Sequence, residues 1–142
     1  MNSINSLSKT PAIGCLIGTA YQILLSRLAS ALKEAGVNIT TSEYLVLRAI
    51  YSKDGLQQCE IADMVGKDKA AICRCVAGLA KKGLVRTESV SHKCLRVYST
   101  EEGRRIEPDL MRVAALRHTE LAEMISHKEL EVFTKVLEKI VK

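Results

Sequence analysis

The stretch that decides the fold is 58-QCEIADMVGKDKAAICRCVAGLAKKG-83. In its first part Ile61 and Val65 recur at helical spacing, and Gly66 can supply the left-handed residue that ends a helix. Asp68 then offers an N-cap for a second helix over residues 69–82, which carries an apolar stripe on one face only. The sequence therefore predicts two short helices joined by a tight turn.

The outer face of the second predicted helix is small and cationic. It comprises Ala70, Cys73, Arg74, Ala77 and Lys81, with Lys69 at the helix start. Small side chains let a helix lie deep in the DNA major groove, and an arginine can reach a guanine edge or a phosphate. A solvated surface helix is the alternative for this segment taken alone.

A basic hairpin follows the second helix. Residues 84–88 and 95–99 are β-rich, alternating runs, and residues 89–94 form the predicted connection between them. Over residues 67–105, ten Lys or Arg oppose four acids, a net charge of +6, whereas the whole chain carries only +5. Concentrated positive charge favours a polyanion, because phosphate contacts release condensed counterions. A membrane surface would need exposed apolar residues on an amphipathic helix beside that charge, and the hairpin offers little of that.

We therefore expect double-stranded DNA as the partner. The residues predicted to contact it are Lys67, Lys69, Ala70, Ala71, Cys73, Arg74, Lys81, Arg86, His92 and Lys93.

The composition of the chain narrows its class further. With 142 residues and 47% hydrophobic content, the chain can bury a single core. One Phe, four Tyr and no Trp argue against a protein that stacks single-stranded bases on aromatic platforms. The apolar stretch 12–32 is interrupted by Gln22, Ser26 and Arg27, so we expect no membrane span, a cytoplasmic location and reduced cysteines.

Apolar helices are predicted on both sides of this unit. One covers residues 11–35 and ends at Gly36, and another follows a capping box at 40–43 and runs to about residue 53. A third starts after 99–102 and runs to about residue 125 with a bend at Pro108, and the last begins at the capping box 126–129.

A DNA-reading unit of about 65 residues does not need so much apolar helix. We expect a homodimer with intertwined termini that reads a pseudo-palindrome, and a monomer with a helical cap is the alternative. The predicted fold is mainly α: a winged helix-turn-helix of about six helices with a two- to three-stranded wing. Residues 1–36 would form an N-terminal dimerisation helix, 37–100 the DNA-binding domain and 101–142 the C-terminal dimerisation helices.

Several segments together resemble the MarR family of bacterial winged-helix regulators. These are 41-TSEYLVL-47, Ile61-Ala62, 82-KGLVR-86 and 99-STEEG-103. The resemblance implies a homodimeric transcriptional regulator, commonly a repressor, that a small phenolic or hydrophobic molecule or cysteine oxidation releases from DNA. It implies neither catalysis nor a cofactor. The chain also has no glycine-rich phosphate loop, nucleophile motif, HExxH or CxxC.

The chain departs from the family pattern in two places. Ala70, Ala71 and Cys73 stand where relatives commonly place Ser and Thr, so Arg74, which matches the family position, is expected to carry more of the contact with DNA. The hairpin is shorter than usual and has His92-Lys93 at its tip in place of the family's Asp-Arg pair, so Lys93 is only a substitute for the usual arginine.

The cysteines suggest a second signal. Cys73 lies beside an arginine and Cys59 in a first helical turn, and both settings favour the thiolate. Cys15 lies roughly where peroxide-sensing relatives carry their reactive cysteine, although Thr41 replaces the tyrosine that activates it there. Cys75 faces inward and is expected to be inert packing.

The small-molecule alternative requires a pocket between the leading helix and the DNA-reading unit. Tyr21, Tyr44 and Arg48 would line it, because each places a polar tip on an otherwise apolar helix; ordinary packing with those tips in water is the competing interpretation. No metal site is expected, since the histidines are scattered and Cys73 and Cys75 diverge on a helix. A protein-interaction module with an incidental basic face is the rival function, and weak salt dependence of DNA binding would favour it.

Overall fold

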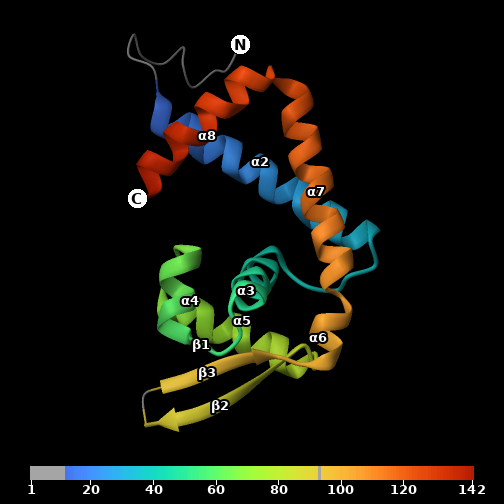
Figure 1. Cartoon of the computed structure of the whole chain (residues 1–142), viewed down its shortest axis with the longest axis vertical. Helices are drawn as coiled ribbons and strands as arrows, with labels where there is room; N and C mark the ends of the chain where they lie inside the picture. The colour runs from blue at the N-terminus through green and yellow to red at the C-terminus, as the bar shows by residue number, and fades with distance from the viewer. Residues whose placement is uncertain (1–11, 93) are drawn as a thin grey trace.

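The computed structural model describes residues 12–92 and 94–142. These residues form seven helices and one three-stranded antiparallel sheet of order β1-β3-β2 (Figure 1). The helices are α2 (Ile13–Glu34), α3 (Thr41–Ser52), α4 (Gln58–Val65), α5 (Lys69–Lys81), α6 (Glu101–Arg105), α7 (Glu107–Met124) and α8 (His127–Val141). The strands are β1 (Leu56–Gln57), β2 (Val85–Ser91) and β3 (Cys94–Ser99). The predicted fold class, a mainly helical winged helix-turn-helix, is confirmed.

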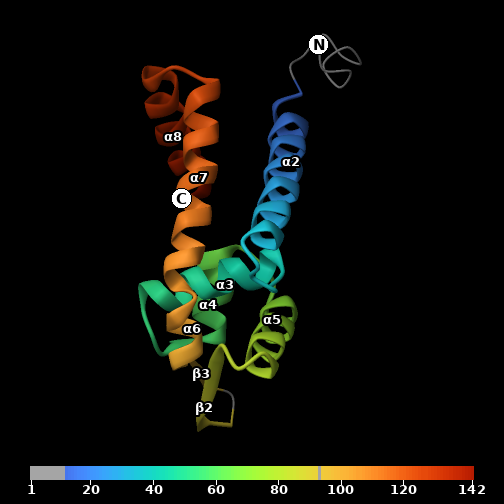
Figure 2. The same cartoon turned by 90° about the vertical axis from the view of Figure 1, so that its right-hand side faces the viewer.

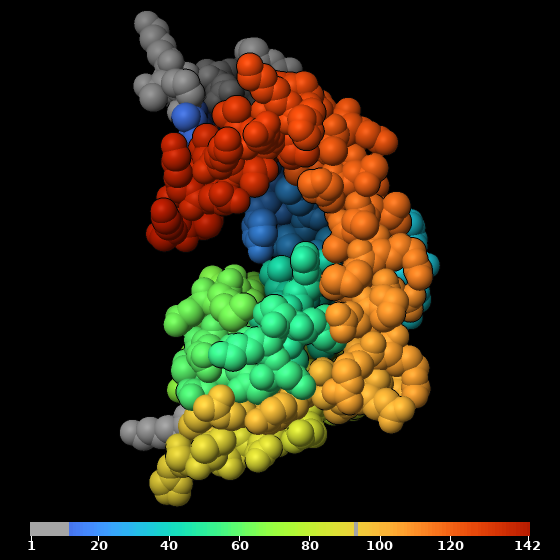
Figure 3. Space-filling model, viewed as in Figure 1, coloured from blue at the N-terminus to red at the C-terminus, as the bar shows by residue number. Residues whose placement is uncertain are grey.

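The molecule has two regions. Helices α3, α4 and α5 and the sheet form one unit, from which α2 and α7 rise together before diverging toward their far ends (Figures 1 and 2). At the far end the chain turns back into α8, which hooks over an open hollow with α2 behind it (Figure 3). The sheet and α5 thus lie at the opposite end of the long axis from α8.

Helix boundaries follow the local signals in the sequence. Thr40 and Glu43 form a reciprocal capping box at the start of α3. Asp68 caps α5 by accepting a hydrogen bond from the Ala71 N–H at 2.7 Å. Gly66, with φ of 75°, occupies the left-handed region that allows the chain to leave α4 and enter α5 within a few residues. These predicted starts and stops are confirmed.

The wing differs from the prediction. Residues 89–91 and Cys94, expected as a loop, belong to the strands, and the register is irregular between Ser89 and Ser91. This irregularity lets one strand carry an extra residue and continue, so pairing extends nearly to the tip. Strand β1 pairs Leu56 with Val97, and its two residues are too few to produce an alternating pattern in the sequence.

The helix after the wing is interrupted rather than only bent. Pro108 has no N–H to donate to the carbonyl of Arg104, and the chain breaks at Ile106 into α6 and α7. The expected bend at this proline therefore becomes a one-residue break between two helices.

The core lies within the unit formed by α3, α4, α5 and the sheet, and at the ends of α2 and α7 that adjoin this unit. Its most completely buried side chains are Leu32, Val46, Leu47, Ile50, Ile61, Ile72, Leu79, Val97 and Leu110. Helix α2 is long and apolar enough to cross a membrane by those two criteria alone, but Leu28, Ala31 and Leu32 at its end are part of this core. Apolar side chains farther out on α2, α7 and α8 remain exposed in the single chain.

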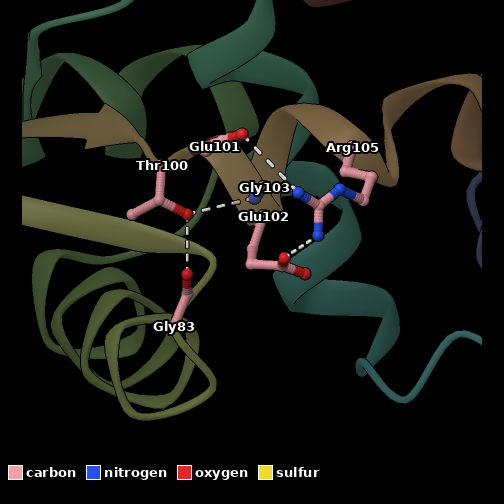
Figure 4. Close-up of polar contacts among 6 residues, drawn as sticks. All are labelled: Gly83, Thr100, Glu101, Glu102, Gly103 and Arg105. Atoms are coloured by element: carbon pink, nitrogen blue, oxygen red, sulfur yellow. Dashed lines mark hydrogen bonds and ion pairs between the residues drawn. The ribbon is translucent and has the colours of Figure 1, made fainter.

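The junction between wing and α6 is closely packed (Figure 4). The Thr100 hydroxyl accepts a hydrogen bond from the Gly103 N–H at 3.0 Å and donates one to the Gly83 carbonyl at 2.6 Å. A Cβ at Gly103 would lie well inside contact distance of the Leu84 carbonyl oxygen. Glycine is therefore required at position 103, where α6 packs against the backbone of Leu84, just after the end of α5.

Candidate nucleic-acid interface

Helix α5 presents two chemically distinct faces. Ile72, Val76 and Leu79 are buried in the core. The opposite side is exposed and comprises Lys69, Ala70, Cys73, Arg74, Ala77 and Lys81, with Ala71 half-buried at its edge. Apart from Arg74 and the two lysines, the side chains of this face are small, so it can approach another surface closely.

Many of the predicted basic residues are held by the fold. Lys82 pairs with Glu43 at 2.7 Å, Arg96 donates to the Gly55 carbonyl at 2.8 Å, and Arg104 donates to the Ser99 carbonyl at 2.9 Å. Arg105 is paired with two glutamates of α6 (Figure 4).

In the described part of residues 67–105, the cations with neither an ion pair nor a side-chain hydrogen bond lie on α5 or directly before it. They are Lys67, Lys69, Arg74 and Lys81, here called the α5 cationic face. The charge available for phosphate contacts is therefore more concentrated than the sequence total suggests.

The wing divides the remaining predicted residues. Arg86 is exposed on β2, with its guanidinium 4.4 Å from the Tyr98 ring centroid and 3.5 Å from the Glu88 carboxylate. His92 instead lines an open hollow of about 480 Å³ together with Lys69 at the start of α5. The structure thus brings His92 and Lys69 together and separates Arg86 from them. Lys93 lies outside the described residues.

Sequence reasoning missed part of this hollow. Gln57 and Gln58 line it at the start of α4, with Ser89, Ser91, Cys94 and Leu95 on the wing. The Gln58 side-chain oxygen accepts a hydrogen bond from the Cys73 thiol at 3.1 Å and so links α4 to the exposed side of α5. The signal in the sequence that could have identified this part of the hollow was the pair of adjacent glutamines at the start of the first predicted helix.

The cysteines occupy different surroundings. Cys59 and Cys73 are exposed near this hollow, whereas Cys15 is exposed near the start of α2, toward the other end of the molecule (Figure 1). Burial, and next the nearby Glu43 carboxylate, raise the pKa of the Cys75 thiol, which keeps it protonated. Among the residues described, no group of three His, Cys, Asp or Glu is arranged to hold a metal ion.

A second cavity, of about 310 Å³, lies between α2, α3 and α7. It brings together Tyr21, Tyr44 and Arg48, the three residues singled out as a pocket, with the Arg48 guanidinium 5.9 Å from the Tyr44 ring centroid. The rest of the wall combines apolar side chains with Arg27, Arg117, His118 and Glu120.

Arg117 is the notable residue of that wall. One guanidinium nitrogen binds Glu120 at 2.8 Å, while its buried Nε has no hydrogen-bond partner within the described residues. The α7 side of the cavity was not predicted, because it comes from the opposite end of the sequence.

Comparison with known proteins agrees with this architecture. A family model described as the MarR family matches residues 35–93, which include the helix-turn-helix and most of the wing. The transcriptional regulator HosA of Escherichia coli O157:H7 is 29% identical over 105 residues, covering 72% of this chain and 78% of HosA.

Solved structures of regulators share the whole fold. CouR from Rhodococcus jostii RHA1, bound to p-coumaroyl-CoA, superposes with a TM-score of 0.79 at 25% identity, covering 91% of each chain. BpsR of Bordetella bronchiseptica, whose DNA binding is regulated by 6-hydroxynicotinic acid, gives a TM-score of 0.85 at 16% identity, covering 93% of this chain and all of BpsR. In its helix-turn-helix, its wing and these relatives, the chain matches the MarR family of winged helix-turn-helix transcriptional regulators, whose members bind DNA.

Proposed function

We propose that the protein is a homodimeric repressor that binds a pseudo-palindromic operator in double-stranded DNA and is released by a small aromatic anion. The observation that carries the proposal is the exposed face of α5, where small side chains surround the cations that no acid neutralises. Such a face fits the major groove, and two copies related by a two-fold axis would read two half-sites.

Within this face the residues have different proposed roles. Arg74 contacts a base edge, since it lies among Ala70, Cys73 and Ala77, whose small side chains admit the helix to the groove. Lys67, Lys69 and Lys81 contact phosphates, and Ala71 borders the same groove. On the wing, His92 and Lys93 approach the DNA backbone. Arg86 adds to the positive electrostatic potential rather than making a direct DNA contact, because its guanidinium stacks on Tyr98.

Homodimerisation is supported by the apolar side chains that the single chain leaves exposed. Ile13 is 62% exposed on α2, Met124 65% on α7, and Ile140 60% on α8, far from the core. A second copy covering these helices would bury apolar side chains that a free monomer leaves in water. On this basis we propose residues 1–36 and 101–142 as dimerisation segments around a DNA-binding domain at 37–100, in a cytoplasmic protein.

The proposed effector follows from the cavity between α2, α3 and α7. Its apolar walls suit an aromatic ring, and Arg27, Arg48 and Arg117 place positive charge around it, so a carboxylate on that ring would be paired. The complex of CouR with p-coumaroyl-CoA and the regulation of BpsR by 6-hydroxynicotinic acid support an aromatic ligand in this fold.

Cysteine oxidation is a second candidate signal. Cys59 and Cys73 are exposed beside the proposed DNA-binding face. A sulfenic acid or mixed disulfide at either thiol would therefore hinder the entry of α5 into the DNA major groove. Cys15 is a separate candidate on α2 and would have to act through the dimer.

The decisive experiment is selection of bound duplexes from a random pool by the purified, reduced protein, repeated with 6-hydroxynicotinic acid and after mild peroxide. We expect an enriched pseudo-palindrome. If 6-hydroxynicotinic acid releases the wild type from DNA but does not release a folded Tyr44→Ala protein, the pocket is supported as the effector site. Loss of DNA binding after peroxide would instead support the cysteines as the sensor. No enrichment at low salt would favour a protein-interaction module instead.

Single substitutions test the assignment of α5. Arg74→Ala should weaken binding to the enriched operator by about 1–3 kcal/mol and relax base preference at one position, whereas Lys81→Ala should weaken all duplexes alike. Equal losses on every sequence for both variants would contradict a base contact by Arg74.

A further inference from the structure

A carboxylate is buried between the helix that lines the cavity and the helix that faces DNA. The Glu43 side chain on α3 is only 7% exposed. Its Oε1 accepts a hydrogen bond from the Thr40 N–H at 2.9 Å and lies 2.7 Å from the Lys82 ammonium at the end of α5. One side chain thus caps α3 and holds the C-terminal end of α5.

A second contact joins the same carboxylate to the body of α5. A Cβ built at Gly78 would lie 2.5 Å from the Glu43 Oε2, so only a residue without a side chain lets the carboxylate approach here. Gly78 and Lys82 are one helical turn apart on α5. Contacts at both fix the rotation of α5 as well as its position along α3.

Stability alone is a poor explanation of this arrangement. The Glu43 carboxylate is buried while the Lys82 side chain is 32% exposed. Desolvation of a buried charge offsets much of the attraction in such a pair, and apolar replacements of similar volume are often at least as stable. What an ion pair supplies is a specific geometry, because a displaced carboxylate leaves a buried charge without its partner. Gly83, the residue after Lys82, is also held in place, because its carbonyl accepts a hydrogen bond from the Thr100 hydroxyl (Figure 4).

The geometry matters at the other end of the helix. Arg74 lies eight residues before Lys82, about 12 Å along the helix axis. A tilt of about 10° at the Lys82 end would displace Arg74 by roughly 2 Å, well beyond the tolerance of about 0.5 Å for a positioned contact. On the α3 side, the residue after Glu43 is Tyr44, which is buried and lines the cavity.

We propose that Glu43 is a positioning residue for DNA recognition: through Lys82 and Gly78 it sets the orientation of α5, and through Tyr44 it links that orientation to the wall of the cavity. The inference rests on the proposed function in one respect, since it requires a preferred operator. It assigns no contact between Glu43 and DNA.

The test compares Glu43→Gln with Glu102→Gln, which removes the same charge from an exposed ion pair on α6. Each variant binds the operator enriched by the wild type and a scrambled duplex of equal length. Electrostatics alone predicts that both variants bind both duplexes slightly more tightly, because each gains one unit of positive charge. The positioning role predicts that Glu43→Gln loses about tenfold on the operator only.

Lys82→Met should lose the same operator preference, and the double variant should be no weaker than the weaker single variant, because both substitutions break one contact. Gly78→Ala provides an independent variant if Glu43→Gln does not fold. Alanine favours the helix, yet its Cβ displaces the carboxylate, so operator preference should fall in a folded protein.

Three results would overturn the inference. Equal behaviour of Glu43→Gln and Glu102→Gln would do so, as would parallel losses on operator and scrambled duplex, or an unchanged operator preference in folded Gly78→Ala. If the wild type itself enriches no sequence, the proposed function fails first and the positioning role fails with it. Enrichment by the wild type with unaltered variants overturns the positioning role alone.

Discussion

Replacing Gly103 by alanine tests the close packing between α6 and the end of α5. Gly103 is buried in a helix, where alanine would ordinarily be favoured by about 1 kcal/mol. Here the added Cβ meets the Leu84 carbonyl oxygen well inside the 3.0 Å below which Cβ contacts are essentially never found. That oxygen cannot move freely, because it accepts the Thr100 N–H at 3.1 Å.

The structural cost should exceed the gain in helix propensity. Overpacking against a fixed group costs about 1–3 kcal/mol, and displacing the Leu84 carbonyl weakens a hydrogen bond that contributes about 1 kcal/mol. After subtracting the helix propensity of alanine, we expect a free energy of unfolding about 2 kcal/mol lower. The Tyr51 hydroxyl, which donates to the Gly103 carbonyl at 2.5 Å, would be displaced as well.

Urea unfolding at fixed protein concentration measures this difference. Gly18→Ala is the matched control, because Gly18 is also helical but has no atom within 4 Å of the position that a Cβ would occupy, so its substitution should be neutral or stabilising. A Gly103→Ala protein as stable as the Gly18→Ala protein would refute the packing argument.

Three further predictions concern charge and titration. If Lys67, Lys69 and Lys81 contact phosphates while Arg74 contacts a base, the logarithm of operator affinity should fall with the logarithm of salt concentration with a slope of about −2.7 per protomer, or about −5 per dimer, and a slope near −2 per dimer would count against these contacts. Burial, with a smaller effect from Glu107, raises the pKa of Tyr51 to about 12. Since the unfolded phenol ionises at about 10, stability should fall between about pH 10 and 12, and pH-dependent urea unfolding of Tyr51→Phe should lack that component. Because the pKa of the Cys75 thiol is raised, iodoacetamide at pH 8.5 should modify Cys73 before Cys75, as peptide mass spectrometry would show. Equal rates of modification at these two thiols would contradict the protected setting of Cys75.

Local chemistry explains why much of the fold could be predicted from the sequence. Asp68 and Gly66 act on the few residues beside them, so they mark the ends of α4 and α5 without knowledge of the rest of the chain. Strand β1 could not be found in this way, since its two residues become a strand only by pairing with β3, about forty positions later. The break at Ile106 likewise needed the actual backbone around Pro108.

The site was predictable to a similar extent. The two faces of α5 follow from helical periodicity, and the three pocket residues emerged from polar tips on apolar helices. Lys82 and Arg96 were counted with the basic segment, but their partners, Glu43 and Gly55, lie 39 and 41 residues away and are invisible to a local pattern. For the same reason Arg117, which reaches the cavity from α7, could not be assigned.

Helix α8 has no buried residue in the single chain, although its apolar side chains include Phe133 and Val136. On the proposed dimer, a copy with a defective α5 but intact α2, α7 and α8 would still pair with normal copies. If half of the chains were defective and pairing were random, only about a quarter of the dimers would hold two working recognition helices. A lesion confined to α5 would then be genetically dominant, whereas a lesion that prevents pairing would be recessive.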